Sequence, residues 1–274
     1  MKEELARRTL LGLGIAFLLG FILIPFGWMV VVALHRSPDF LLRPGGLTLQ
    51  NFVDVLKQQS LHFPDYLRNS AVVSGVAAVV SASLGALAAY AIGRIRPPGR
   101  VGLVLGVLAL SMFPQVSIVG YLYRAASSLG WLNTYPALIL PYIAWSLPLA
   151  LWIMLSYFAQ IPEDLDRAAL VDGAGRLQIF TRVVMPLALP GFLATVLLLF
   201  MFSFNEFLFA LMLTVDSQAQ TVPVGIALFQ GLHGETPWGH IMAASCVSCL
   251  PVVLIALFLQ RYIVQGLAGG AVKG

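Results

Sequence analysis

The side chains that could do chemistry are few, and they lie among long apolar segments. Glu206 is the only acidic residue inside such a segment, and Asn205 precedes it. A charge in a membrane is costly and marks a polar cavity or a partner by default, so these two residues could line a pathway for a hydroxyl-rich solute. A buried pair that fixes the bundle or a partner interface is the alternative, and it is favoured. Trp131, Trp145 and Trp238 could stack on a solute, although anchoring at the membrane interface is the favoured interpretation.

The other candidate nucleophiles and ligands form no catalytic set. Cys246 and Cys249 have the C-x-x-C spacing of redox and metal sites, but no second pair and no charged neighbour accompanies them. We therefore expect ordinary side chains that face lipid or the bundle. The four histidines lack close ligand spacing, so no metal site is predicted. An intramembrane enzyme would have only Glu206 and the two cysteines within its spans, and no catalytic residue is assigned.

The sequence also lacks the motif that would let it use ATP by itself. No G-x-x-x-x-G-K-[ST] phosphate loop is present, and the only lysines are Lys2, Lys57 and Lys273. The energy for any active process must then come from another chain. The net charge of +4 is not gathered into a basic run or an RNA-binding motif, so no nucleic-acid partner is expected.

Composition identifies the environment of these residues. Of the 274 residues, 59% are hydrophobic and 10% are charged, whereas soluble domains carry roughly 25% charged residues. An all-α polytopic membrane protein is predicted, with six transmembrane helices at residues 9–34, 70–93, 101–123, 137–158, 187–215 and 241–260. The first segment follows a basic start, but it exceeds the 7–15 apolar residues of a signal peptide, so we expect it to remain as a span.

The distribution of basic residues predicts the orientation. Of the 16 lysines and arginines, 11 lie in the N-terminus, residues 94–100, residues 159–186 and the tail, and 5 lie in the segments on the other side. Loops rich in positive charge remain in the cytoplasm, so both termini and the 159–186 loop are expected there. On the outer side, Phe52, Val55 and Leu56 predict a short amphipathic helix that starts near Thr48. It could be a lid over the spans or a docking surface for an external partner.

The cytoplasmic loop of residues 159–186 has the pattern of two short helices. Pro162 can open a helix with acidic residues in its first turn. Leu165, Ala168, Ala169 and Asp172 then fall at positions i, i+3, i+4 and i+7, so they share one face. The two alanines make that face flat. Such a helix could press against a soluble partner, or it could lie on the lipid headgroups.

A glycine and a second helix complete the loop. Gly173 can turn the chain at little steric cost. A short helix from Arg176 to Met185 is expected to return to the membrane, with Phe180 and Val184 as its apolar contacts.

These residues resemble those of a known family. Arg167-Ala-Ala-Leu-Val-Asp-Gly-Ala, with Phe180, Pro186 and Pro190 after it, closely resembles the EAA loop of binding-protein-dependent ABC importer permeases. The resemblance covers nearly the whole chain and includes Met112-Phe-Pro, Leu132-Asn-Thr, Phe204-Asn-Glu-Phe and Trp238-Gly. The C-terminal run from Gln260 to Gly274 is very similar to the carbohydrate-uptake branch of the family.

The resemblance implies a function for the whole chain, residues 1–274, as a single permease domain. Such a permease carries a carbohydrate or related polyol across the cytoplasmic (inner) membrane of a prokaryote. Its expected partners are a second permease subunit of different sequence, two ATPase subunits that bind ATP and Mg²⁺, an external solute-binding protein and membrane lipid. No cofactor is expected in this chain, which is a transport subunit rather than an enzyme. A permease for glycerol phosphate or an amino sugar is the alternative.

The resemblance also assigns roles to residues. The ATPase-coupling set is Leu165, Arg167, Ala168, Ala169, Asp172 and Gly173. A tail that reaches towards the ATPases includes Gln265, Gly266, Lys273 and Gly274. Arg167 replaces the glutamate that is usual in the EAA triplet, and we expect the nearby Glu163, Asp164 and Asp166 to provide the acidic contact instead.

Overall fold

Helices make up all the regular secondary structure of residues 2–35, 46–229 and 237–271, which are the ranges that the computed structural model describes. In chain order they are α1 Lys2–Ala33, α2 Gln50–Lys57, the 3₁₀ turn η1 Gln59–Leu61, α3 Phe63–Tyr90, the π-helical turn η2 Ala91–Ile95, α4 Arg100–Ser111, α5 Gln115–Ser128, α6 Tyr135–Phe158, α7 Asp164–Val171, α8 Arg176–Ile179, the π-helical turn η3 Phe180–Val184, α9 Met185–Phe204, α10 Leu208–Leu213, α11 Val222–Ala227 and α12 Trp238–Ala271. The predicted all-α fold is confirmed.

Five helical segments in the described ranges are long and apolar enough to cross a membrane, namely Arg7–Ala33, Phe63–Ile95, Tyr135–Phe158, Arg176–Phe204 and Trp238–Gln260. The third predicted span, residues 101–123, is not one straight helix. It consists of α4 and α5, which meet at a bend of 87°. Pro114 precedes α5, lacks an N–H donor and disfavours a helical conformation at Phe113, so it breaks the helix where hydropathy continues unchanged.

The fifth predicted span is also broken. The apolar segment of residues 187–215 contains α9, which ends at Phe204, and then the separate short helix α10. Asn205 and Glu206 therefore lie at a helix break and not in the middle of a continuous span.

The described residues divide into two compact units, and the first contains α1, α2, η1 and the start of α12. Its α2 is the predicted amphipathic helix, with Val55 fully buried and Leu56 47% exposed. Asn51 on α2 donates hydrogen bonds from Nδ2 to the carbonyl oxygens of Ala33 and His35, both at 2.8 Å, which ties α2 to the end of α1. Most of the α1 surface stays open, since only 6% of its spanning segment is buried.

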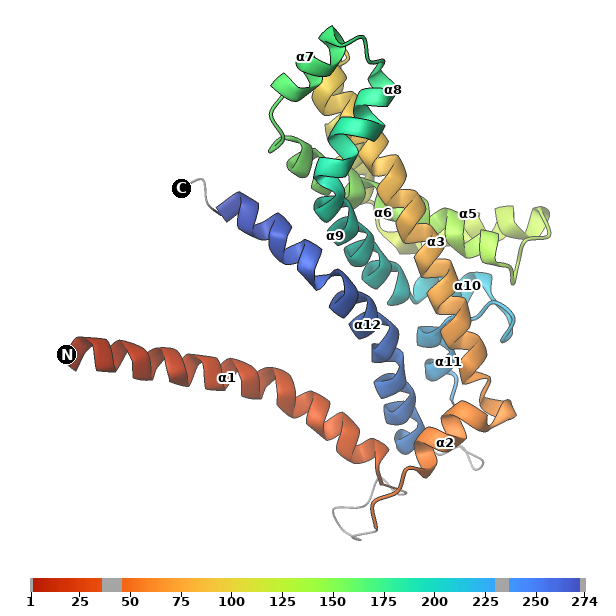
Figure 1. Ribbon diagram of the computed structural model, residues 1–274. Helices are drawn as coiled ribbons and strands as arrows, with labels where there is room; N and C mark the ends of the chain where they lie inside the picture. Colours follow the sequence, from red (N-terminus) through yellow and green to blue (C-terminus); the bar gives the residue numbers. More distant parts are fainter. Residues whose placement is uncertain (1, 36–45, 230–236, 272–274) are drawn as a thin grey trace. The chain divides into compact units, whose positions relative to one another are not determined.

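The second unit is built on α3, α6 and α9 (Figure 1). Small residues allow the helix backbones to approach closely, as the alanine- and serine-rich segment of α3 predicts. A Cβ on Gly85 of α3 would lie 2.6 Å from the Cβ of Ala150 on α6. The hydroxyls of Ser81 and Ser146 are 3.0 Å apart between the same two helices. Gly191 of α9 packs equally closely on the ring of Tyr157.

Two buried clusters fill the second unit, and each underlies one candidate site. One is built around Tyr142 and Phe209, where α6 meets α10. The other is built around Phe158 and Phe180 with Tyr90, at the end that carries α7 and α8 (Figure 1).

Candidate functional site

The 159–186 loop forms the predicted helix–glycine–helix structure. Helix α7 carries Asp164 and Asp166 in its first turn and ends at Val171. Gly173 follows with φ of +83°, a conformation that residues other than glycine rarely adopt. Its N–H donates to the Leu170 carbonyl, and the N–H of Ala174 donates to that of Ala169, which closes the end of the helix. The predicted turn at Gly173 is confirmed.

The second half of the loop, α8 and η3, which we call the return leg, is continuous with the membrane-spanning helix α9. Gln178 accepts a hydrogen bond at Oε1 from the Gly175 N–H (2.9 Å) at the start of α8. Phe180 and Val184 are buried, as predicted, in the π-helical turn η3. The helix does not stop at Met185, because η3 continues without a break into α9. Helix α8, η3 and α9 therefore form one helical segment, from Arg176 to Phe204.

The outer face of α7 carries most of the predicted coupling residues. Leu165, Ala168 and Asp172 are exposed, as is the side chain of Arg167, whereas Ala169 is half-buried against the cluster around Phe180. Three exposed apolar residues of the loop are not in the predicted set, namely Leu170 at 40%, Val171 at 88% and Leu177 at 68%. Val171 follows Ala168 by three positions, so the helical period could have identified it.

Three acidic residues of the loop, Glu163, Asp164 and Asp166, form ion pairs within the chain. Arg167 pairs with Asp164 (Nη1 to Oδ1, 3.3 Å) and lies 3.9 Å from Glu163, which also pairs with Arg96. Asp166 is buried and lies 3.8 Å from Arg94. The expectation that Asp166 could replace the EAA glutamate as an outer contact is therefore wrong, because its carboxylate points inward.

The predicted tail contact with the ATPases is not tested by the structure. Gln265 and Gly266 belong to α12, and Lys273 and Gly274 lie outside the described residues. The thiols of Cys246 and Cys249, also on α12, are half-buried and free.

The second candidate site lies where α9 ends. Asn205 and Glu206 line a groove of about 720 Å³ together with Gln115 at the start of α5 and a set of apolar residues. The apolar residues are Leu149, Leu198, Met201, Phe202, Phe207 and Leu208. Asn205 is exposed and donates from Nδ2 to the carbonyl of Met201 at 2.7 Å. Three of these nine side chains are polar, an unusual lining for a surface that faces only lipid.

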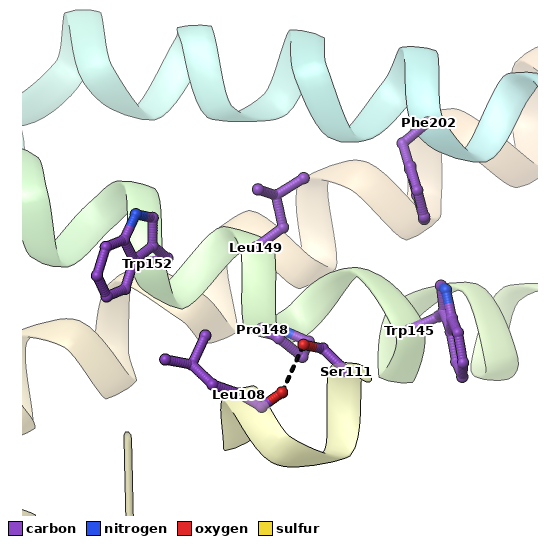
Figure 2. A pocket seen from close by; sticks show the side chains of 7 residues that line it. All are labelled: Leu108, Ser111, Trp145, Pro148, Leu149, Trp152 and Phe202. Atoms are coloured by element: carbon purple, nitrogen blue, oxygen red, sulfur yellow. Dashed lines mark hydrogen bonds between the residues drawn. The ribbon is translucent and has the colours of Figure 1, made fainter. Parts of the chain in front are cut away.

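A neighbouring hollow of about 500 Å³ extends this groove, since Leu149 and Phe202 line both (Figure 2). Trp145 and Trp152 of α6 line it, with Leu108 and Ser111 of α4 opposite. The two tryptophans are seven residues apart and so lie on one face of α6. The sequence analysis named Trp145 but missed Trp152, which is 55% exposed.

A family model described as the inner-membrane component of binding-protein-dependent transport systems matches residues 71–269 of the chain. The chain belongs to this family. The match covers both the loop of residues 159–186 and the groove, and the predicted membership of this family is confirmed. The protein is a permease subunit of an ABC importer.

Relatives agree with this assignment, and a solved structure shares the fold. The permease is 51% identical over 277 residues, 100% of both chains, to the trehalose/maltose transport system permease of Thermococcus litoralis. It is 39% identical over 259 residues, 93% of this chain and 94% of the relative, to the trehalose transport system permease of Mycobacterium tuberculosis. In fold it is similar to a chain of a bacterial ABC transporter that imports alginate, with a TM-score of 0.73, 20% identity and coverage of 93% and 97%.

Within the permease, Glu206 has a structural role that its residue type alone did not reveal. Its buried carboxylate accepts hydrogen bonds from the Tyr142 hydroxyl (2.8 Å) and from the backbone N–H groups of Phe209 (2.9 Å) and Ala210 (3.2 Å). The last two are free N–H groups in the first turn of α10, which have no partner within the helix. Glu206 thus restarts the helix and ties it to α6, so the favoured alternative of a buried residue that fixes the bundle describes it better than a free solute ligand.

Replacing Glu206 with Gln should lower the thermal stability of the purified importer. The carboxylate of Glu206 faces three hydrogen-bond donors, and the NH₂ group of a glutamine would place a donor against some of them. The groups left without a partner should cost about 1–3 kcal/mol. Asn205→Ala removes one hydrogen bond at an exposed position and serves as the control, with a smaller expected shift of the midpoint in detergent. An unchanged midpoint for Glu206→Gln would contradict the structural role.

Proposed function

We propose that this permease imports a carbohydrate, and specifically a disaccharide of α-linked glucose units of the trehalose or maltose class. The observation that carries the proposal is the 51% identity to the Thermococcus litoralis trehalose/maltose permease along the whole length of both chains. The relative from Mycobacterium tuberculosis is also a trehalose permease. Carbohydrate as the substrate class agrees with a groove that combines aromatic faces with amide groups.

The proposed partners supply what the sequence lacks, above all a phosphate-binding loop for ATP. We propose that it pairs with a second, different permease subunit, that two ATPases hold ATP and Mg²⁺, and that an external binding protein delivers the sugar. The open surface of α1 supports a partner or lipid around it. This chain then acts as a transport subunit rather than an enzyme. The distribution of lysine and arginine supports the inner membrane of a prokaryote with both termini in the cytoplasm.

The loop of residues 159–186 is proposed as the contact with the ATPases. Leu165, Ala168 and Val171 give α7 an exposed apolar stripe, and Gly173 sets the direction in which the chain leaves it. Arg167 and Asp164 neutralise each other beside this stripe. Arg167, Ala169 and Asp172 complete the proposed coupling set, while Gln265, Gly266, Lys273 and Gly274 remain a proposed tail contact.

The groove is proposed as part of the solute pathway. Trp145 and Trp152 present ring faces that suit the C–H faces of a sugar, and Asn205 and Gln115 present amides that suit its hydroxyls. The lining contains no lysine or arginine, which disfavours an anion such as glycerol phosphate as the substrate. Glu206 lines the groove while its carboxylate is occupied by hydrogen bonds inside the chain, so Asn205 is the better solute contact of the pair.

Transport can be tested in proteoliposomes that contain the complete importer, assembled with the second permease, ATPase and binding protein from the same genome. We expect ATP-dependent accumulation of labelled trehalose or maltose, with little accumulation of glycerol phosphate or glucosamine. Uptake of one of the latter in place of the disaccharides would overturn the substrate class. The absence of ATP-dependent uptake of all four solutes would overturn the function.

Gly173→Val should abolish uptake while the importer still assembles. A β-branched residue at φ of +83° is strained by more than the roughly 1–2 kcal/mol that an ordinary side chain costs there, so the turn must rearrange and reorient α7. Gly173→Asn is the matched control, because asparagine tolerates this conformation. Normal uptake by the valine variant, measured beside co-purification of the ATPase, would contradict a coupling role for the turn.

Trp152→Leu should raise the sugar concentration for half-maximal uptake by several-fold, in line with the loss of one exposed stacking contact. The importer should assemble as before, since Trp152 is 55% exposed. Trp131→Leu removes a tryptophan outside the groove and serves as the control. Equal behaviour of the two variants in uptake titrations would remove Trp152 from the pathway.

A further inference from the structure

The side chain of Arg94 is buried beneath the loop of residues 159–186, which we call the coupling loop. It lies in η2, the π-helical turn that ends the α3 span, and only 4% of its side chain is exposed. A buried guanidinium has to be paired and hydrogen-bonded, because the loss of hydration is otherwise too costly. Its neighbour Arg96 is 52% exposed, as expected for an arginine at the end of a span. The burial of Arg94 therefore reflects specific contacts.

Arg94 joins the end of the α3 span to two elements that are distant from it in the sequence, the end of α6 and α7. It is carried by the end of α3, and its Nη2 donates hydrogen bonds to the carbonyl oxygens of Phe158 (2.8 Å) and Ile161 (2.6 Å). Phe158 is the last residue of α6 and Ile161 follows it by three positions, so both bonds place the guanidinium at the negative end of the α6 dipole. The Nε atom faces the third element, α7, and lies 3.8 Å from Oδ2 of Asp166.

Asp166 is the buried anchor of α7. Its side chain is 8% exposed, whereas that of Asp164, one position before Leu165, is 86% exposed. Arg94 is the cation beside it, and Oδ1 of Asp166 has no hydrogen-bond partner among the described residues. At 3.8 Å the pair is in ionic contact but is not hydrogen-bonded. Helix α7 could approach α3 by about 1 Å before the pair reached the usual 2.7–2.9 Å of a charge-assisted hydrogen bond.

Neighbouring contacts hold the return leg of the loop against the ends of α3 and α6. The rings of Tyr90 and Phe180 are 5.2 Å apart between centroids, and the Tyr90 hydroxyl donates to the Arg176 carbonyl at 3.3 Å. Phe158 packs edge-on against Phe180 at 6.5 Å. The loop is therefore held to α3 by apolar packing on the η3 side and by Arg94 on the α7 side.

We propose that Arg94 is a positioning residue for transport, which locks α7 to the end of α3 so that a displacement of the coupling loop moves α3 with it. This inference rests on the proposed coupling function of the loop. Without Arg94, the buried Asp166 would lose its cation and the end of α6 would lose two hydrogen bonds, so α7 could tilt independently of the spans. Lysine cannot replace it fully, because a single ammonium group lacks the planar, fork-shaped set of donors that serves two carbonyls and a carboxylate.

The test uses the complete importer with four variants: Arg94→Ala, Arg94→Lys, Asp166→Ala and the double alanine variant. Arg96→Ala is the matched control, because Arg96 also pairs with the loop, through Glu163, but at an exposed position. Co-purification reports assembly. Uptake, and ATP hydrolysis with and without the loaded binding protein, report coupling.

We expect Arg94→Ala to assemble and hydrolyse ATP, while uptake per ATP hydrolysed falls by about tenfold, as for a lost interaction of a buried charge. Arg94→Lys should fall between Arg94→Ala and the native importer. The double variant should be no worse than the more impaired single variant, because both residues act through one contact. Arg96→Ala should stay within about twofold of the native importer. Normal coupling in Arg94→Ala, or additive losses in the double variant, would overturn the proposal.

A second measurement does not depend on the transported solute. Spin labels at Ile95 and Val171, both exposed, would be introduced after Cys246 and Cys249 are replaced by alanine. The distance distribution between the labels should be narrow in the native importer and broad in Arg94→Ala. Equal widths would overturn the proposal, even if Arg94→Ala fails to transport. A broad distribution in the variant, in an importer that transports none of the tested sugars, would instead contradict the proposed function and leave the positioning role standing.

Discussion

The constraint on which this structure depends is that helix ends inside an apolar environment must have their backbone groups satisfied within the protein. A spanning helix satisfies its own N–H and C=O groups, but every break exposes a set of them. Two of the few charged side chains meet this need, one at the N-terminus of a helix and one at the C-terminus of another. Glu206 accepts the N–H groups at the start of α10, and Arg94 donates to the carbonyls at the end of α6. Each charge has the sign that the helix dipole favours at its end.

The sequence predicted features that follow from composition and local period. The apolar segments located the spans, and the i, i+3, i+4 pattern with Gly173 located the coupling loop. Hydropathy could not predict the bend at Pro114, because it is unchanged across the bend, whereas the backbone loses an N–H donor there. The pairing of Arg94 with Asp166 was also out of reach, because 72 positions separate them and each resembles an ordinary loop charge. Glu206 was singled out correctly as unusual, but its capping role required the coordinates.

The charges of α7 are divided between its two faces, and this bears on the substitution in the EAA triplet. Asp166 faces inward to Arg94, while Asp164 and Arg167 pair with each other on the outside. Exposed ion pairs of this kind contribute little energy. The exposed apolar residues Leu165 and Val171 are then the larger part of what α7 can offer to a partner. A proposed contact built on apolar burial tolerates arginine in place of glutamate better than one built on a single ionic pair would.

Helix α9 links the two sites. It continues from η3 without a break and ends at Phe204, beside Asn205 in the groove (Figure 1). Twenty residues of α-helix extend about 30 Å, roughly the thickness of the hydrocarbon core. Gly191 packs it against α6 at close range, and Glu206 fixes the far end to Tyr142 of the same helix. On the proposed function, a push on the loop therefore reaches the groove through a helix that is held to α6 near its start at Gly191 and just past its end at Glu206.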